Sequence, residues 1–195
     1  MEFDGPARYE PARHDVSASG CRSEAQASWL RTIARTAMVA RTAVVYVVTP
    51  VGETRVVGYY ALAAASVRPE EAPRPLLKPA GKRPVPVALV ARLGVDTSAR
   101  GHGLGAALVM DAMLRARQAA GIIGARALLV QAESGTARDF YLHIAESDES
   151  PADPLHLVLL MSDIEAVVSA TTLRSLDIEG LGGQDRRIHS ISPAS

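Results

Sequence analysis

The spacing of apolar residues changes several times along this chain, and each spacing predicts a different element. Over residues 23–39 the apolar positions recur at helical spacing, which predicts a helix that Ser23 is placed to cap. The segments 44–48 (VVYVV) and 55–67 (RVVGYYALAAASV) are rich in β-branched and aromatic residues, and the turn residues TPVGET separate them. Together these two segments predict a β-hairpin.

Proline interrupts this pattern after the hairpin. Residues 68–86 hold six prolines. Since proline fixes φ and lacks a backbone N–H, we expect this segment to be a long exposed loop, neither a helix nor a central strand. The next run, VALVARLGV at 87–95, is apolar enough to predict a strand buried on both faces.

A second set of elements follows a glycine-rich turn. The amphipathic helix that begins there carries Asp111 and Arg115 as a favourable i,i+4 pair, and Gly121 and Gly124 are expected to close it. The remaining expected elements are a strand at 125–132, a helix at 134–146 and a strand at 154–161.

This order of elements predicts a mixed α/β sheet with helices packed on it. The chain has 195 residues, of which 48% are hydrophobic, enough for one domain with a sizeable core. Residues 1–20 are polar and are expected to form a flexible arm, and 21–164 the folded domain. Residues 165–195 have a lower hydrophobic density and are expected to form a partly disordered tail.

Charge and cysteine content restrict the classes of function. The 21 basic and 21 acidic residues give a formal net charge of zero, so any site for a polyanion must be a local patch. Cys21 is the only cysteine, which favours a reducing compartment. The opening MEFDGPARYE is unlike a secretory signal, and the longest apolar run is too short to span a bilayer. We therefore expect a cytoplasmic protein without a membrane partner.

Three glycines, Gly101, Gly103 and Gly105, lie where a helix is about to begin, although glycine disfavours helices. Without a Cβ the backbone can approach a phosphate closely, and the N–H groups that open a helix attract anions. Two nucleotide templates fail. The P-loop needs a lysine and a serine or threonine where this chain has Ala106 and Ala107, and the dinucleotide fingerprint needs another glycine spacing.

The turn does fit the pattern Arg-x-x-Gly-x-Gly, through Arg100, Gly103 and Gly105. This pattern resembles the pyrophosphate-binding motif of the GCN5-related N-acetyltransferases (GNAT). The segment 90–141 and the flanking WLRTIA, VGYYALAAASV and PADPLHLVLLMSDI resemble one branch of that superfamily, the acetyltransferase toxins of type II toxin–antitoxin systems, which acetylate aminoacyl-tRNA. The resemblance covers roughly residues 15–165 and implies the GNAT fold, a mostly antiparallel mixed sheet with helices on both faces.

The resemblance also implies roles for individual residues. Acetyl-CoA is the implied cosubstrate, and Leu93, Gly94 and Val95 match the strand whose backbone pairs with the pantetheine arm. Tyr141 matches the tyrosine that acts as general acid towards the coenzyme A thiolate; outside this resemblance, the pair with Phe140 indicates core packing. The residues implied to hold the pyrophosphate are Arg100, Gly101, His102, Gly103, Leu104, Gly105 and Ala106.

The acceptor side is less determined by the sequence. Arg92, Lys82 and Arg83 are candidates for contact with tRNA phosphates, and a solvated charged surface explains them equally well. His102 either touches phosphate or is an exposed turn histidine. No cysteine–histidine cluster indicates a metal site.

Three features depart from the family pattern. The Gly-Phe pair that usually follows the tyrosine is absent, and the segment 146–153 carries four acids that would repel tRNA at short range. Gly94 stands where the family usually has alanine, which is expected to loosen the strand slightly. The chain also continues beyond the last predicted strand, to residue 195.

Three functions therefore stay open. The first is an acetyl-CoA-dependent N-acetyltransferase toxin that acts on aminoacyl-tRNA, forms a homodimer and is neutralised by a ribbon-helix-helix antitoxin. The second is a GNAT enzyme acting on a small-molecule or protein amine. The third is a decayed, non-catalytic acetyl-CoA-binding domain, suggested by the missing Gly-Phe pair. Acetyl transfer to charged tRNA, to free amines or to neither distinguishes them.

Overall fold

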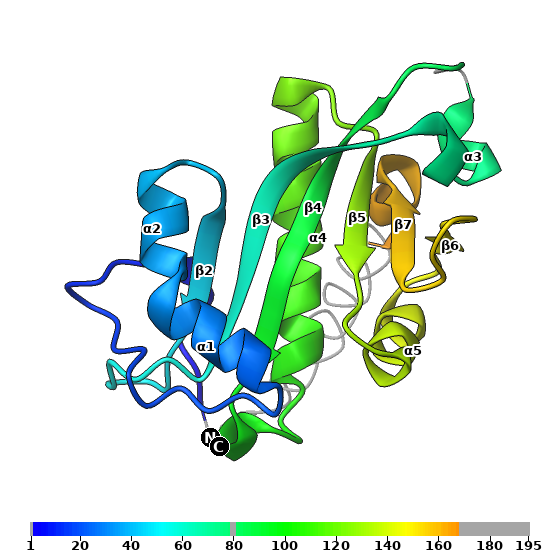
Figure 1. Cartoon of the computed structure of the whole chain (residues 1–195). Coiled ribbons are helices and arrows are strands. Elements are labelled where there is room, and N and C mark those ends of the chain that lie inside the picture. Colours follow the sequence, from blue (N-terminus) through cyan, green and yellow to red (C-terminus); the bar gives the residue numbers. More distant parts are fainter. Residues whose placement is uncertain (1, 79–80, 168–195) are drawn as a thin grey trace, which may run out of the picture.

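Seven strands form one sheet in the computed structural model, which describes residues 2–78 and 81–167 (Figure 1). In spatial order the strands are β1 (Ala7–Arg8), β2 (Val44–Val48), β3 (Gly58–Val67), β4 (Val85–Val95), β5 (Ala127–Gln131), β7 (His156–Leu160) and β6 (Asp148–Glu149). Only β4 and β5 pair in parallel; the other neighbours are antiparallel. The predicted fold class, a mixed and mostly antiparallel sheet, is confirmed.

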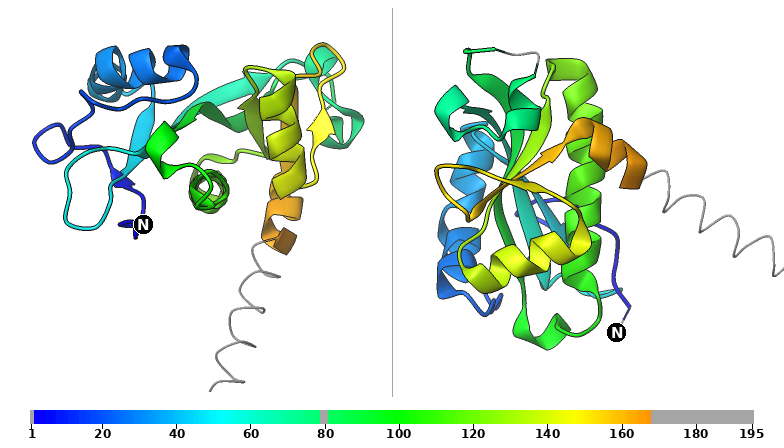
Figure 2. Two further views of the ribbon diagram at one scale, coloured as in Figure 1. Left: turned by 90° about the horizontal axis from the view of Figure 1, so that it is seen from below. Right: turned by 90° about the vertical axis from the view of Figure 1, so that its right-hand side faces the viewer.

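Helices cover both faces of this sheet (Figure 2). The helices are α1 (Glu24–Thr32), α2 (Ala34–Val39), α3 (Arg74–Leu77), α4 (Leu104–Ile123) and α5 (Gly135–Ile144), with 3-10 turns η1 (Pro69–Glu71) and η2 (Thr97–Ala99). Buried residues of α1 and α2, such as Leu30, pack on one face, and those of α4, such as Leu108 and Met113, pack on the other. The core is therefore divided by the sheet into two layers.

The long helix α4 follows its prediction closely. Asp111 and Arg115 form the expected ion pair, with 2.8 Å between Arg115 Nε and Asp111 Oδ2, and the Tyr60 hydroxyl donates a hydrogen bond to the same carboxylate. Gly124 ends the helix in a left-handed conformation with φ of 76°, whereas Gly121 lies inside the helix and does not close it. The hydrogen bond from Tyr60 thus ties the polar face of α4 to β3.

The N-terminal residues differ from the expected loose arm. Ala7 and Arg8 pair with β2 as an edge strand, and Tyr9 is buried against the layer of α1 and α2. The Arg115 guanidinium donates to the carbonyl oxygen of Pro6 at 3.1 Å. A two-residue strand is too short to show a hydrophobic period, so the pattern of apolar residues carried no signal for this pairing.

The proline-rich segment also differs from its prediction. It contains η1 and the short helix α3, and β4 begins at Val85, within the expected loop. The exclusion of a helix was wrong because Pro75 occupies the first turn of α3, where the missing N–H has no intrahelical partner to lose. Ala72 and Leu76 are buried, so part of this segment belongs to the core.

The C-terminal boundary is only partly visible. Residues 161–167 are helical and Ile164 is buried in the layer that contains α4. The tail expected at 165–195 lies outside the described residues from 168 onward.

The buried leucine of α3 provides a test of this fold. Leu76 is 0% exposed and packs with Val67 and Val85, so Leu76→Ala should lower the free energy of unfolding by about 2–5 kcal/mol. The neighbouring Leu77 is only partly buried, and Leu77→Ala should cost less than half as much. Urea unfolding measures both values; equal losses, or none for Leu76→Ala, would contradict the packing of this segment.

Candidate active site

A cleft opens where β4 leaves β5. The two strands are paired only from Ala88 to Val90 on β4. The pairing of β4 with β3 shows a bulge at Ala91. Ala61 pairs with Arg92, but the next residue, Leu62, pairs with Val90, so Ala91 has no partner in β3. From Arg92 to Val95, β4 pairs with β3 on one side and with no described strand on the other. This edge leaves backbone N–H and C=O groups available to an extended ligand that carries amides.

The glycine turn forms the end of this cleft. Gly101 and Gly103 have φ of 79° and 74°, a left-handed conformation that residues with a Cβ adopt only at a cost. Gly103 is the N-cap of α4, and no side chain caps the helix there. The first N–H groups of a 20-residue helix are thus left for an anion at the positive end of its dipole.

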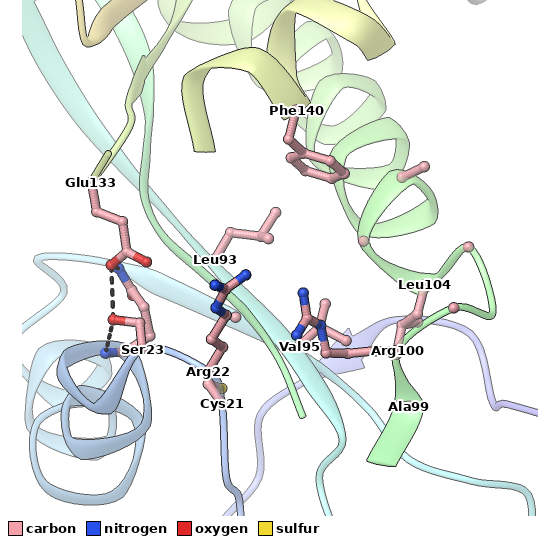
Figure 3. A pocket seen from close by; sticks show the side chains of 16 residues that line it. Cys21, Arg22, Ser23, Leu93, Val95, Ala99, Arg100, Leu104, Glu133 and Phe140 are labelled. Atoms are coloured by element: carbon pink, nitrogen blue, oxygen red, sulfur yellow. Dashed lines mark hydrogen bonds between the residues drawn. The ribbon is translucent and has the colours of Figure 1, made fainter. Parts of the chain in front are cut away.

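The cleft has a volume of about 360 Å³ and combines apolar, cationic and anionic groups (Figure 3). Leu93, Val95, Leu104 and Phe140 supply apolar surface, and the side chains of Arg22 and Arg100 project into the same space. Neither arginine forms an ion pair within the described residues, so both can meet a phosphate. Its other lining residues are Cys21, Ser23, Gln26, Gly94, Ala99, Gly101, Gly103, Gly105, Ala106 and Glu133.

Asp96 holds the N-terminal segment beside the turn. Its carboxylate accepts hydrogen bonds from the Gly20 N–H at 2.7 Å and from the Ser98 N–H at 2.8 Å. Burial by itself raises the pKa of Asp96, but hydrogen bonds from the Ser98 hydroxyl and from these two N–H groups, together with the Arg55 charge, hold that pKa below its usual value. The ionised carboxylate therefore keeps Cys21 and Arg22 at the wall of the cleft.

Gly94 has a packing role that the sequence did not reveal. A Cβ at this position would lie 2.7 Å from Tyr59 Cε1 and 2.8 Å from Cys21 Sγ. Tyr59 cannot easily move, because it is fully buried, stacks on Trp29 and donates a hydrogen bond to the Gln26 carbonyl oxygen. Glycine here makes room for this tyrosine, rather than merely loosening β4 as predicted.

Tyr141 lies behind the wall of the cleft. It is half-buried in α5, packs against the core layer of α4, and meets the ring of Phe140 at 5.4 Å between centroids. Its hydroxyl has no hydrogen-bond partner within the described residues. Burial, and secondly the Glu133 carboxylate, raise the pKa of Tyr141, which keeps the phenol protonated at neutral pH, the form that a general acid needs.

The structure brings most of the predicted cosubstrate residues together, with one exception. The cleft is lined by Leu93, Gly94, Val95, Arg100, Gly101, Gly103, Leu104, Gly105 and Ala106. His102 does not line it, because its Nδ1 lies 2.9 Å from the Arg100 carbonyl oxygen and its ring faces Phe3.

The predicted acceptor residues lie apart from the cleft. The Arg92 guanidinium lies over the Trp29 ring, 5.8 Å from its centroid. Lys82 and Arg83 lie just before the first residue of β4, whereas the cleft lies at the last residues of this strand. At the usual rise per residue the two ends of β4 are roughly 30 Å apart. These lysine and arginine side chains therefore do not contribute to the cleft itself.

Sequence reasoning missed Glu133 and Arg22. Glu133 lies two residues after the end of β5, and the carboxyl ends of adjacent parallel strands are where α/β sheets place ligands, so its position was a usable signal. Arg22 carried no such signal, because only the tertiary structure brings it to the cleft.

Burial raises the pKa of the neighbouring Cys21 thiol to about 11, which disfavours the thiolate that a nucleophile needs. Within residues 2–78 and 81–167 no cluster of potential metal ligands occurs.

Comparison with known proteins agrees with this geometry. The model of the acetyltransferase (GNAT) family matches residues 18–144. A protein of Mycobacterium tuberculosis (strain ATCC 25618 / H37Rv) named tRNA-acetylating toxin is 49% identical over 114 residues, which are 58% of this chain and 68% of that protein.

Solved structures share the fold at lower sequence identity. AtaT complexed with acetyl-methionyl-tRNAfMet has a TM-score of 0.77 at 23% identity, covering 86% of this chain and 99% of its own. A tyrosine-to-phenylalanine mutant of the AtaT toxin, bound to the C-terminus of the antitoxin AtaR and acetyl-CoA, has a TM-score of 0.72 at 21% identity, covering 87% and 99%.

The packing around Gly94 gives a test of the site. Gly94→Ala should lower the free energy of unfolding by about 1–3 kcal/mol, because the added methyl group overpacks Tyr59 and Cys21. Gly121→Ala makes the same chemical change inside α4 with nothing within 4 Å of the new Cβ, and should raise stability by about 0.4–1 kcal/mol. Urea unfolding measures the free energy of unfolding of both variants. An unchanged value for Gly94→Ala would contradict this packing and show that Tyr59 is free to shift.

Proposed function

This chain belongs to the acetyltransferase (GNAT) family, and from that premise we propose that it transfers the acetyl group of acetyl-CoA to the amino group of an aminoacyl-tRNA and thereby inhibits translation. The observation that carries the proposal is the 49% identity to the tRNA-acetylating toxin over 68% of its length. The cleft beside β4 supports it, because it combines a phosphate site with an apolar channel.

Acetyl-CoA is the cosubstrate in this proposal. The N–H groups at the start of α4 suit its pyrophosphate, as does the guanidinium of Arg100, which forms no ion pair with any residue that the structure describes. The unpaired edge of Leu93, Gly94 and Val95 suits the amides of its pantetheine arm. The His102 side chain has no part in this site, because it faces Phe3.

Tyr141 supplies the proton for the departing thiolate. The amine nitrogen forms a bond to the acetyl carbon and gives up one of its protons, the carbon–sulfur bond breaks, and the thiolate takes the phenolic proton. The proton released from the nitrogen restores the phenol through exchange with water. The phenol of Tyr141 is protonated at neutral pH and so has a proton to donate to the thiolate. Its hydroxyl is not used in any hydrogen bond of the described residues, which leaves it available to substrate.

The acidic segment 146–153 repels tRNA less than its composition indicates. Glu149 pairs with Arg138, and the Asp153 carboxylate lies 3.6 Å from His156 Nε2. A paired carboxylate repels a phosphate less than an isolated one. The acidic segment therefore does not by itself favour a decayed domain.

A small antitoxin of the ribbon-helix-helix class is the proposed protein partner, as AtaT is bound to the C-terminus of AtaR. We extend the proposal to a homodimer in the cytoplasm. No helix of the described part of the chain is long and apolar enough to cross a membrane. Co-purification of the chain with the product of a neighbouring small gene checks the antitoxin, and the mass of the complex checks the dimer.

Tyr141→Phe tests the proposed reaction. With labelled acetyl-CoA and charged tRNA, the wild-type chain should form acetyl-aminoacyl-tRNA, and the variant should lose about 10²–10⁴-fold in kcat, the range for a general acid. Tyr46→Phe is the matched control, a partly buried tyrosine outside the cleft, and should keep wild-type activity. Acetylation of free amines but not of charged tRNA would favour the second function, and coenzyme A binding without turnover the third.

A further inference from the structure

Glu133 presents one free carboxylate oxygen to the cleft. Its Oε2 accepts hydrogen bonds from Ser23 Oγ at 2.9 Å and from Gln26 Nε2 at 3.0 Å (Figure 3). Its Oε1 has no partner among the residues that the structure describes, and the side chain forms no ion pair there. One oxygen is thus used for positioning, and the other is open to a ligand.

Side chains of α1 and β3 fix the orientation of this carboxylate. The Tyr59 hydroxyl donates to the Gln26 carbonyl oxygen at 2.7 Å and lies 3.2 Å from Gln26 Oε1. These contacts orient the Gln26 amide so that its Nε2 donates to Glu133. Tyr59 is itself immobilised by burial and by stacking on Trp29. The carboxylate is therefore held by a chain of contacts that ends in the core.

None of the described groups around Glu133 forms an ion pair with it. Cys21 carries no charge at neutral pH, because burial raises the pKa of its thiol to about 11. Burial likewise raises the pKa values of Tyr59 and Tyr141, and the Glu133 carboxylate raises them further. Arg22 precedes Ser23 in the chain and is one of the two arginines that line the cleft. It forms no ion pair within the described part of the chain. A carboxylate in these surroundings suits a positively charged or proton-losing ligand group.

We propose that Glu133 binds the amino group of the acceptor and accepts its proton. The inference rests on the proposed function, because it requires an amine acceptor in this cleft. As the nitrogen forms its bond to the acetyl carbon, one N–H proton passes to Glu133 Oε1, the carbon–sulfur bond breaks, and the thiolate takes the proton of Tyr141. Exchange with water afterwards returns a proton to Tyr141 and removes the one on Glu133. Glu133 thus lines the cleft, and Tyr141 lies beside Phe140, another of its lining residues.

Glu133→Gln separates this role from a merely structural one. The glutamine oxygen can still accept from Ser23 and Gln26, so the contact between α1 and the end of β5 is kept while the charge and the base are lost. The matched control is Glu146→Gln, which removes the same charge from an exposed residue outside the cleft. Thermal unfolding and the KM for acetyl-CoA should be the same for both variants.

The experiment measures kcat/KM with charged tRNA and with the methyl ester of the same amino acid as acceptors. Glu133→Gln should lose about 10²-fold or more with both acceptors, the range for a general base. Glu146→Gln should stay within twofold of the wild type. An unchanged kcat/KM in Glu133→Gln, or a loss that appears only in the KM for acetyl-CoA, would overturn the assignment of Glu133.

The two acceptors separate the inference from the proposed function. If the wild-type chain acetylates the ester but not charged tRNA, the proposed function fails, and the loss in Glu133→Gln with the ester still decides the role of Glu133. A wild-type chain that acetylates neither acceptor overturns both.

Discussion

The loss of strand pairing beyond Val90 is the constraint on which the site depends. β4 and β5 share three paired residues and then separate at the bulge of Ala91, so a central strand of the sheet ends with one unpaired edge. Backbone groups need hydrogen-bond partners, and at this edge of the cleft water or an extended ligand can supply them. The same separation places the start of α4 and the end of β5 on opposite sides of one opening, where phosphate and amine chemistry can meet.

A continuous line of packing connects this backbone feature to the chemistry. Gly94 makes room for Tyr59, and Tyr59 orients Gln26, which positions Glu133. The position at which this chain departs from the alanine usual in the family is therefore not an isolated weakness of β4. It allows a buried tyrosine to set the geometry of the opposite wall of the cleft.

The sequence correctly predicted the elements whose position depends on the local spacing of apolar residues and glycines. β2 coincides with the expected segment 44–48, and the glycine turn and helix α4 occur where spacing placed them. β1 and β6 are too short to show a period, and α3 lies among prolines that only its first turn tolerates. Glu133 and Arg22 were missed because their proximity to the cleft depends on the arrangement of α1, β4 and β5. The resemblance to a known family supplied Tyr141, which local pattern alone places in the core.

A titration of the isotopically labelled chain with coenzyme A, followed through its backbone amide NMR signals, tests the central claim most directly. If the unpaired edge of β4 and the start of α4 hold the cosubstrate, the amide signals of residues 93–95 and 101–106 should show the largest changes in chemical shift. Changes that spare these two segments, or binding that shifts only residues elsewhere on the sheet, would contradict the account.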